Sequence, residues 1–368
     1  MSVRRAALAG LSPWIGLTVL LPFVNFVTMI LLATLPDGPR ERWDPARGAQ
    51  PSPPPAVEVI RTVRAIGAAF ACGAVTFLVV VNGFGDYAAS FFLGAPLVMG
   101  AIAGFVYNRP DPRPLGKTIL LGVLVMAIAG GFLLLFAFEG LICLAMAVPI
   151  VVPLALLGAA LGKGVADATR TGLGQVVPLA LALPLVAGAE SLVAPLPEYC
   201  VLTTVEVDAP PEAVWRHVVA FADIPPPTEW FFRAGVACPL RARIEGSGVG
   251  AVRHCEFTTG DFVEPVTAWD EPRRLAFDVA AQPDPMVELS PWGHVHPPHL
   301  RDRSLQSRRG EFLLVDLGGG RTRLEGRTWY TFAMRPQAYW TLWSDFSIHA
   351  IHRRVLAHIK RLAEADAG

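Results

Sequence analysis

The pattern of hydrophobic and polar positions changes near residue 197. Before that point the chain consists of long apolar runs that hold almost no charge, and after it short stretches alternate between apolar and polar residues. Six of the early runs approach the roughly 20 residues that a helix needs to cross a bilayer: 11–35, 65–81, 87–108, 118–138, 140–162 and 171–189. We therefore predict an α-helical transmembrane bundle of about six spans over 1–196 and a soluble domain over 197–368.

The first run has two interpretations, because an apolar segment at the start of a chain can be a secretory signal. Its apolar core is longer than the usual signal core of about 7–15 residues, and no small-x-small cleavage site clearly follows it. We interpret it as a retained helix.

Basic residues in the connecting loops predict the orientation. The odd-numbered loops hold Arg40, Arg42, Arg47, Arg61, Arg64, Arg109, Arg113, Lys117, Lys163 and Arg170, whereas the second loop and the turn at Glu139 hold none. With six spans, the positive-inside rule places these loops in the cytoplasm and the C-terminal half outside it. Arg4 and Arg5 argue for the opposite orientation, and one span more or fewer would also reverse it. The localisation we predict is an integral membrane protein, with the extracytoplasmic side favoured for the soluble half.

Charged residues are scarce inside the predicted spans. Asp86, Glu139, Asp167 and Glu190 all fall at span ends, which is typical of interfacial residues and gives little support to an ion or proton path. Small residues would let helices approach each other closely in the membrane: Gly130, Gly131, Gly158, Ala159 and Ala160.

The soluble half begins with a strand pattern. Apolar and polar residues alternate over 201–208, and the segment that follows starts a short helix with Pro210, Pro211 and Glu212. Alternation and turn residues predict further strands at 240–245, 251–258, 262–269, 275–280, 311–317 and 322–330, with connections short enough to require antiparallel neighbours. A long amphipathic helix is predicted over 336–365.

This order of elements resembles the helix-grip fold of the START-like superfamily, also called SRPBCC, which includes polyketide cyclases/dehydrases and lipid-transfer domains. The likeness is carried by residues 205–215, the 248–250 turn before the strand with Arg253, the 266–275 hairpin and the terminal helix. The resemblance implies an α+β domain in which an antiparallel sheet wraps around the long C-terminal helix and encloses a cavity for an apolar ligand. It implies no catalytic set, because the fold hosts both carriers and enzymes.

The segment 282–309 is predicted to be a long insertion without structure of its own. It contains His294, His296 and His299, whose imidazoles could coordinate a metal, line or gate the cavity, or lie on an ordinary surface loop. The spacing matches no standard zinc motif, so we expect no metal and no cofactor. Its length suggests a lid over the cavity.

Two further groups of polar residues are candidates for chemistry. Asp345 and His349 lie four residues apart on the terminal helix and His352 follows three residues later, so all three could lie along neighbouring rows. A carboxylate that holds an imidazole would suit a general base, although such pairs commonly only neutralise a helix face. His254 and Glu256 share one face of their strand, opposite Cys255 and Phe257, and whichever pair faces the cavity is a candidate ligand contact.

Aromatic residues are frequent near the expected cavity, where they either fill a core or line an apolar pocket. The candidate ligand-binding residues are Trp215, Trp230, His254, Trp269, Trp292, Trp329, Tyr339 and Trp343. No nucleotide motif is present, and the near-balanced charge argues against nucleic acid. The expected partners are membrane lipids and a hydrophobic small molecule.

Three hypotheses for function follow. The favoured one is binding of a lipid, polyketide or isoprenoid near the membrane. The second is a cyclase/dehydrase-type enzyme that uses the catalytic candidates His294, His296, His299, Asp345 and His349. The third is a module that reports ligand occupancy through the membrane helices.

Overall fold

The computed structural model describes the chain apart from residues 1–54, 84–87, 169–184, 187–188, 190–195 and 302–303. The contacts divide the chain into two units. The first comprises Met1–Phe132 and Ala147–Val193, and the second comprises Leu133–Met146 and Ala194–Gly368. The turn between the fourth and fifth predicted spans therefore belongs with the C-terminal residues.

The apolar runs of the first unit form helices. Their bounds are α3 Pro55–Phe77, η3 Leu78–Gly83, η4 Ser90–Gly94, α4 Ala95–Asn108, α5 Leu115–Leu135 and α6 Leu141–Ala168, of which η3 and η4 are π-helical. Within the described residues, four helical segments are long and apolar enough to cross a membrane: Ala56–Val81, Ser90–Asn108, Leu115–Leu135 and Leu141–Ala168. They correspond to the second to fifth predicted spans. The predicted spans at 11–35 and 171–189 lie outside the described residues except for isolated positions, so the count of six stays a prediction.

Helices α4 and α6 approach each other through glycines. A Cβ atom added to Gly100 would lie 2.0 Å from the carbonyl oxygen of Ala155, and one added to Gly158 would lie 2.0 Å from that of Leu97. By contrast, a Cβ on Gly130 or Gly131 would meet nothing within 4 Å. Gly158 therefore has the close-approach role expected of it, whereas the two glycines of α5 face open space in the described structure.

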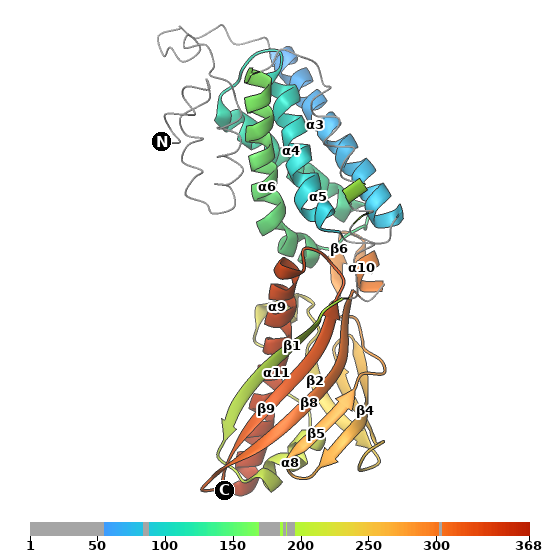
Figure 1. Cartoon of the computed structure of the whole chain (residues 1–368), viewed down its shortest axis with the longest axis vertical. Helices are drawn as coiled ribbons and strands as arrows, with labels where there is room; N and C mark the ends of the chain where they lie inside the picture. The colour runs from blue at the N-terminus through green and yellow to red at the C-terminus, as the bar shows by residue number, and fades with distance from the viewer. Residues whose placement is uncertain (1–54, 84–87, 169–184, 187–188, 190–195, 302–303) are drawn as a thin grey trace. The chain divides into compact units, whose positions relative to one another are not determined.

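The second unit is built on a seven-stranded antiparallel sheet with the order β1-β9-β8-β5-β4-β3-β2. The strands are β1 Glu198–Val207, β2 Pro239–Glu245, β3 Val252–Phe257, β4 Gly260–Asp270, β5 Arg274–Asp278, β8 Leu305–Gly318 and β9 Arg321–Phe332. Figure 1 shows the long strands curving around α11, Gln337–Ala367. The helix-grip architecture predicted from the order of elements is confirmed.

Two shorter helices complete the core of this domain. They are α8, Pro211–Val219, and α9, Trp230–Ala234. The apolar stripe of α8 buries Val214 and Trp215 against the sheet residues Leu275 and Leu324 and against Ile359 of α11. Pro210 precedes the first turn of α8, where its missing N–H costs no hydrogen bond, and Glu212 meets the positive helix end.

The insertion 282–309 has structure that the sequence did not predict. A two-stranded hairpin forms from β6, Glu288–Ser290, and β7, Gly293–Val295; α10, Pro298–Arg301, follows it, and β8 already begins at Leu305. Strands of three residues are too short to show an alternating pattern. The expectation of a structureless loop is therefore wrong.

The turn between α5 and α6 is held by the carboxylate of Glu288, which is fully buried. The backbone N–H of Ile142 donates to its Oε2 at 2.9 Å and that of Cys143 donates to its Oε1 at 2.6 Å. Ile142 and Cys143 belong to the first turn of α6. The backbone N–H groups of a first turn have no hydrogen-bond acceptor within the helix. Gly140 permits the contact, because a Cβ there would lie 2.2 Å from Oε2 of Glu288.

Candidate functional site

Two adjoining cavities lie between the sheet and α11. The first has a volume of about 100 Å³ and the second of about 150 Å³. They share five lining residues: Phe257, Phe262, Ser307, Ile348 and Ile351. The sheet curves around α11 (Figure 1), and side chains of both line the space between them.

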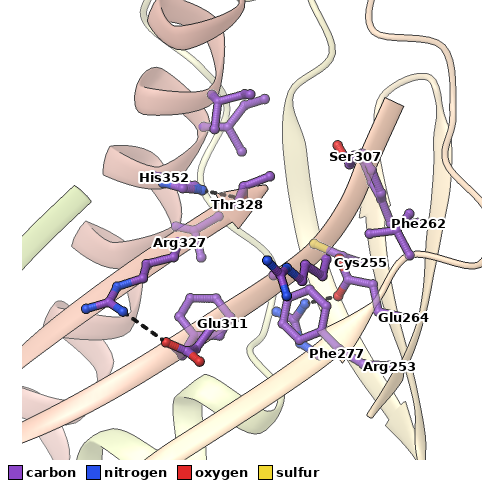
Figure 2. Close-up of a pocket in the computed structure, with 18 of the residues that line it drawn as sticks. Arg253, Cys255, Phe262, Glu264, Phe277, Ser307, Glu311, Arg327, Thr328 and His352 are labelled. Carbon is purple, nitrogen blue, oxygen red and sulfur yellow. Dashed lines mark hydrogen bonds and ion pairs between the residues drawn. The ribbon is translucent and has the colours of Figure 1, made fainter. Parts of the chain in front are cut away.

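A buried ion pair lines the first cavity. Arg253 on β3 is 2% exposed and pairs with the carboxylate of Glu264 on β4, as Figure 2 shows. The guanidinium also lies over three aromatic rings, with its carbon 5.7 Å from the centroid of Phe221, 5.4 Å from that of Phe277 and 5.5 Å from that of Phe312. Burial lowers the pKa of the Arg253 guanidinium, but the charge and hydrogen-bond interactions with Glu264 and Cys255 together outweigh it, and the net effect is a raised pKa.

The thiol of Cys255 lies beside this pair on the same face of β3. Burial raises the pKa of Cys255 to about 12, so the thiol stays protonated at neutral pH. We assign it a lining role in the first cavity.

A neutral imidazole, His352 of α11, also lines the first cavity. Its Nε2 lies 2.8 Å from the hydroxyl of Thr328, and its Nδ1 lies 3.1 Å from the hydroxyl of Thr203. Burial, together with the neighbouring His349, lowers the pKa of His352 to about 4. At neutral pH this ring therefore has one donor and one acceptor nitrogen and no charge. Figure 2 shows His352 beside Thr328.

The second cavity is mainly apolar. Its lining includes Phe332, Met334, Trp340, Trp343 and Leu300, with a few polar groups at its edge. Among those groups are Cys143 and His299, whose Sγ and Nε2 atoms lie 3.1 Å apart. A mostly apolar lining with few polar groups is the usual composition of a small-molecule site.

The structure separates the three histidines of the insertion. His294 lies on β7 and is exposed. His296 is largely exposed, with Nε2 3.7 Å from a carboxylate oxygen of Asp284. His299 on α10 is 6% exposed and points to Cys143 and Glu139. The three rings therefore do not form one site in this structure.

The two candidates on α11 also take separate partners. A carboxylate oxygen of Asp345 accepts a hydrogen bond from the hydroxyl of Tyr330 at 2.6 Å. Nδ1 of His349 lies 2.8 Å from the hydroxyl of Thr203. Neither residue is among those that line the two cavities. Their catalytic role stays a prediction.

Of the eight candidate ligand-binding residues, Trp343 lines one of these two cavities. Trp215 and Trp269 pack edge to face in the core, with centroids 5.5 Å apart. His254 lies on the face of β3 opposite Arg253 and Cys255, near Glu245. The others lie elsewhere: Trp230 is 77% exposed, Trp292 is 70% exposed, Trp329 is covered by the guanidinium of Arg309, and the hydroxyl of Tyr339 donates to the carbonyl oxygen of Met146.

Sequence reasoning did not identify Arg253 and Glu264 as site residues. A signal was available for Arg253, because it alternates with Cys255 and Phe257 on one face of β3. Helical spacing grouped His352 with Asp345 and His349, but it did not indicate the hydroxyls of Thr203 and Thr328, which come from two different strands.

The family comparison concerns this same part of the chain. Residues 199–364 match the family described as polyketide cyclase / dehydrase and lipid transport. The resemblance of the C-terminal half to the START-like superfamily, predicted from the sequence, is confirmed. The START-like domain covers somewhat less than half of the chain, and the match does not extend to the apolar helices.

Solved structures similar to the START-like domain include proteins of different kinds. Norcoclaurine synthase of Thalictrum flavum is 12% identical, with 48% of this chain and 100% of that chain covered and a TM-score of 0.32. The Zhui aromatase/cyclase of Streptomyces sp. R1128 is 20% identical, with 46% and 94% covered and a TM-score of 0.27. A protein of Nitrosospira multiformis is 18% identical, with 46% and 97% covered and a TM-score of 0.29. No curated protein matches the sequence.

Proposed function

We propose that the START-like domain binds a hydrophobic small molecule, such as a lipid, polyketide or isoprenoid, and that the apolar helices hold this domain at a membrane. The observation that carries the proposal is the pair of adjoining cavities along α11. Their lining is mainly apolar, and their shared residues Phe257, Ile348 and Ile351 would let one elongated molecule occupy both.

The polar groups of the first cavity support a ligand with a polar end. The hydroxyl of Thr328, which lines this cavity and contacts the neutral His352, could exchange a further hydrogen bond with a ligand hydroxyl, and Arg253 could attract a partial negative charge while it keeps its ion pair with Glu264. The apolar second cavity would take the hydrocarbon part of the same molecule. This division favours an amphiphilic ligand over a purely hydrocarbon one.

The test is to identify molecules that copurify with the full chain in nanodiscs, by mass spectrometry of an organic extract. Ser307 lines both cavities, so Ser307→Trp would fill the passage between them. We expect this variant to lose the copurified molecule by at least about tenfold, since a ligand that spans both cavities would have to give up the hydrophobic contacts of one of them.

The matched control is Ser247→Trp in the exposed turn between β2 and β3. It adds the same side chain outside the cavities and should retain the molecule. Equal retention by both variants would contradict the proposal, because a ligand held elsewhere would not sense the filled passage.

A further inference from the structure

Three side chains meet beside the second cavity, and two of them, Cys143 and His299, line it. Glu139 lies in the turn between α5 and α6, Cys143 lies in the first turn of α6, and His299 lies on α10. Nε2 of His299 is 3.1 Å from Sγ of Cys143, and Nδ1 of the same ring is 3.6 Å from Oε2 of Glu139. Glu139 is 7% exposed and His299 is 6% exposed.

These residue types could hold a metal ion, since one ligand atom from each lies within 4.8 Å of the others. The orientation of the ring favours a different function. A metal ion takes one nitrogen of an imidazole, whereas here the two nitrogens face different partners, with the thiol on one side and the carboxylate on the other. The imidazole lies between the thiol and the carboxylate. This is the arrangement of a nucleophile, its general base and the group that orients the base.

The backbone around the thiol is held in place. The N–H of Cys143 donates to Glu288, and Gly140 allows that carboxylate to approach. On another side of the sulfur, Sδ of Met286 lies 4.0 Å away and also lines the second cavity. The thiol therefore has a fixed direction, a base within reach and an apolar space beside it.

We propose that Cys143, His299 and Glu139 form a nucleophilic site that accepts an acyl group from an apolar ester or thioester bound in the second cavity. Cys143 attacks the acyl carbon, and a bond from Sγ to that carbon forms as the bond to the leaving alcohol or thiol breaks. Nε2 of His299 takes the thiol proton and returns it to the leaving group. Glu139 is a positioning residue, because its negative charge, 3.6 Å from Nδ1, favours the tautomer with the proton on that nitrogen and so leaves the lone pair of Nε2 directed at the thiol.

The inference rests on the proposed function only in its use of the second cavity. Its test therefore uses a small synthetic ester, p-nitrophenyl butyrate, with the full chain in nanodiscs, and does not depend on whether a natural ligand copurifies. We expect release of one p-nitrophenolate per protein in a first phase, together with a mass gain of one butyryl group on the peptide that contains Cys143.

The variants separate the three roles. Cys143→Ser should remove the butyryl adduct, and His299→Asn should slow acylation by about 10²–10⁴-fold, the usual contribution of a general base. Glu139→Gln should slow acylation and move the pH at which its rate is half-maximal, and Glu139→Asp should recover part of the rate. Cys200→Ser, which removes an exposed thiol on β1, is the matched control and should behave like the original chain.

Three results would overturn the proposal. One is the absence of an adduct on Cys143 in protein whose thermal unfolding is normal. Another is acylation at an unchanged rate in a folded His299→Asn variant, since the thiol would then act without the imidazole. The third is stoichiometric binding of added Zn²⁺ that requires all three residues, which would make the cluster a metal centre.

Discussion

At the scale of single residues, the most unusual feature is a charged side chain in the interior of the START-like domain. Arg253 is surrounded by Phe221, Phe277 and Phe312, and Glu264 is its one partner of opposite charge among the ion pairs of the described residues. A buried ion pair adds little net stability when it is complete, but removal of one partner leaves an uncompensated charge in an apolar environment. The effects of substituting Arg253 and Glu264 on the free energy of unfolding should therefore be strongly coupled.

This dependence can be measured with a double-mutant cycle. Arg253→Met should lower the free energy of unfolding by about 3–5 kcal/mol, because Glu264 stays buried without its cation. Arg253→Met combined with Glu264→Leu should cost clearly less than the sum of the single changes. Denaturant unfolding followed by tryptophan fluorescence reports on this domain, which contains most of the nine tryptophans.

The control for this cycle is the exposed pair Arg241 and Glu256 on β2 and β3. Arg241→Met should change the free energy of unfolding little, since solvent screens that pair. Strictly additive effects of the Arg253 and Glu264 substitutions would refute the coupling.

At the scale of elements, the contact between α4 and α6 depends on the absence of side chains. Gly100 and Gly104 of α4 face Ala155 and Ala159 of α6, and Gly158 faces the α4 backbone at Leu97. Without water to drive apolar surfaces together, helices in a bilayer associate through van der Waals contact between such small residues. The spacing of four residues places the glycines on one helix face.

Gly158→Leu should therefore separate the two helices. The new side chain would meet the carbonyl oxygen of Leu97, and overpacking of this kind costs about 1–3 kcal/mol. Amide hydrogen exchange in α4 and α6 should become roughly 10- to 100-fold faster. Gly130→Leu on α5 adds the same side chain into open space and should leave the exchange of α4 and α6 unchanged.

At the scale of the whole molecule, one helix connects two loops of different charge. Arg109, Arg113 and Lys117 lie before or within the first turn of α5, and the turn that follows α5 is bound to the START-like domain through Glu288. If α5 crosses the membrane once, the domain lies on the side opposite these basic residues. Under that condition, the positive-inside rule predicts that the domain lies outside the cytoplasm, and the prediction does not depend on the number of spans before α5.

Cysteine labelling in intact cells checks this orientation. In a background with Cys200→Ser, Ser247→Cys in the exposed β2–β3 turn should react with a membrane-impermeant maleimide, whereas Gly116→Cys at the start of α5 should react only after permeabilisation. The reverse labelling pattern would show that the domain faces the cytoplasm.

The helices, the strands and the type of fold could be predicted from the sequence alone. Apolar runs predicted the four helices that the structure describes as long and apolar enough to span a membrane, and alternation predicted the strands from β1 to β9 outside the insertion. Both signals are local, because buried positions recur every few residues along a helix or a strand. The pattern can therefore be recognised within a single segment. The order of these segments was sufficient for the helix-grip architecture.

The contacts between side chains from distant segments could not be predicted in this way and became visible in the folded chain. The sequence placed Asp345 beside His349 by their spacing, yet Asp345 bonds to Tyr330 and His349 to Thr203. It grouped His299 with the two histidines nearest in the chain, yet His299 meets Cys143, which precedes it by 156 residues. These contacts depend on how the sheet curves around α11 and on where the α5–α6 turn is held. A local periodicity carries no information on the distance between segments so far apart in the chain.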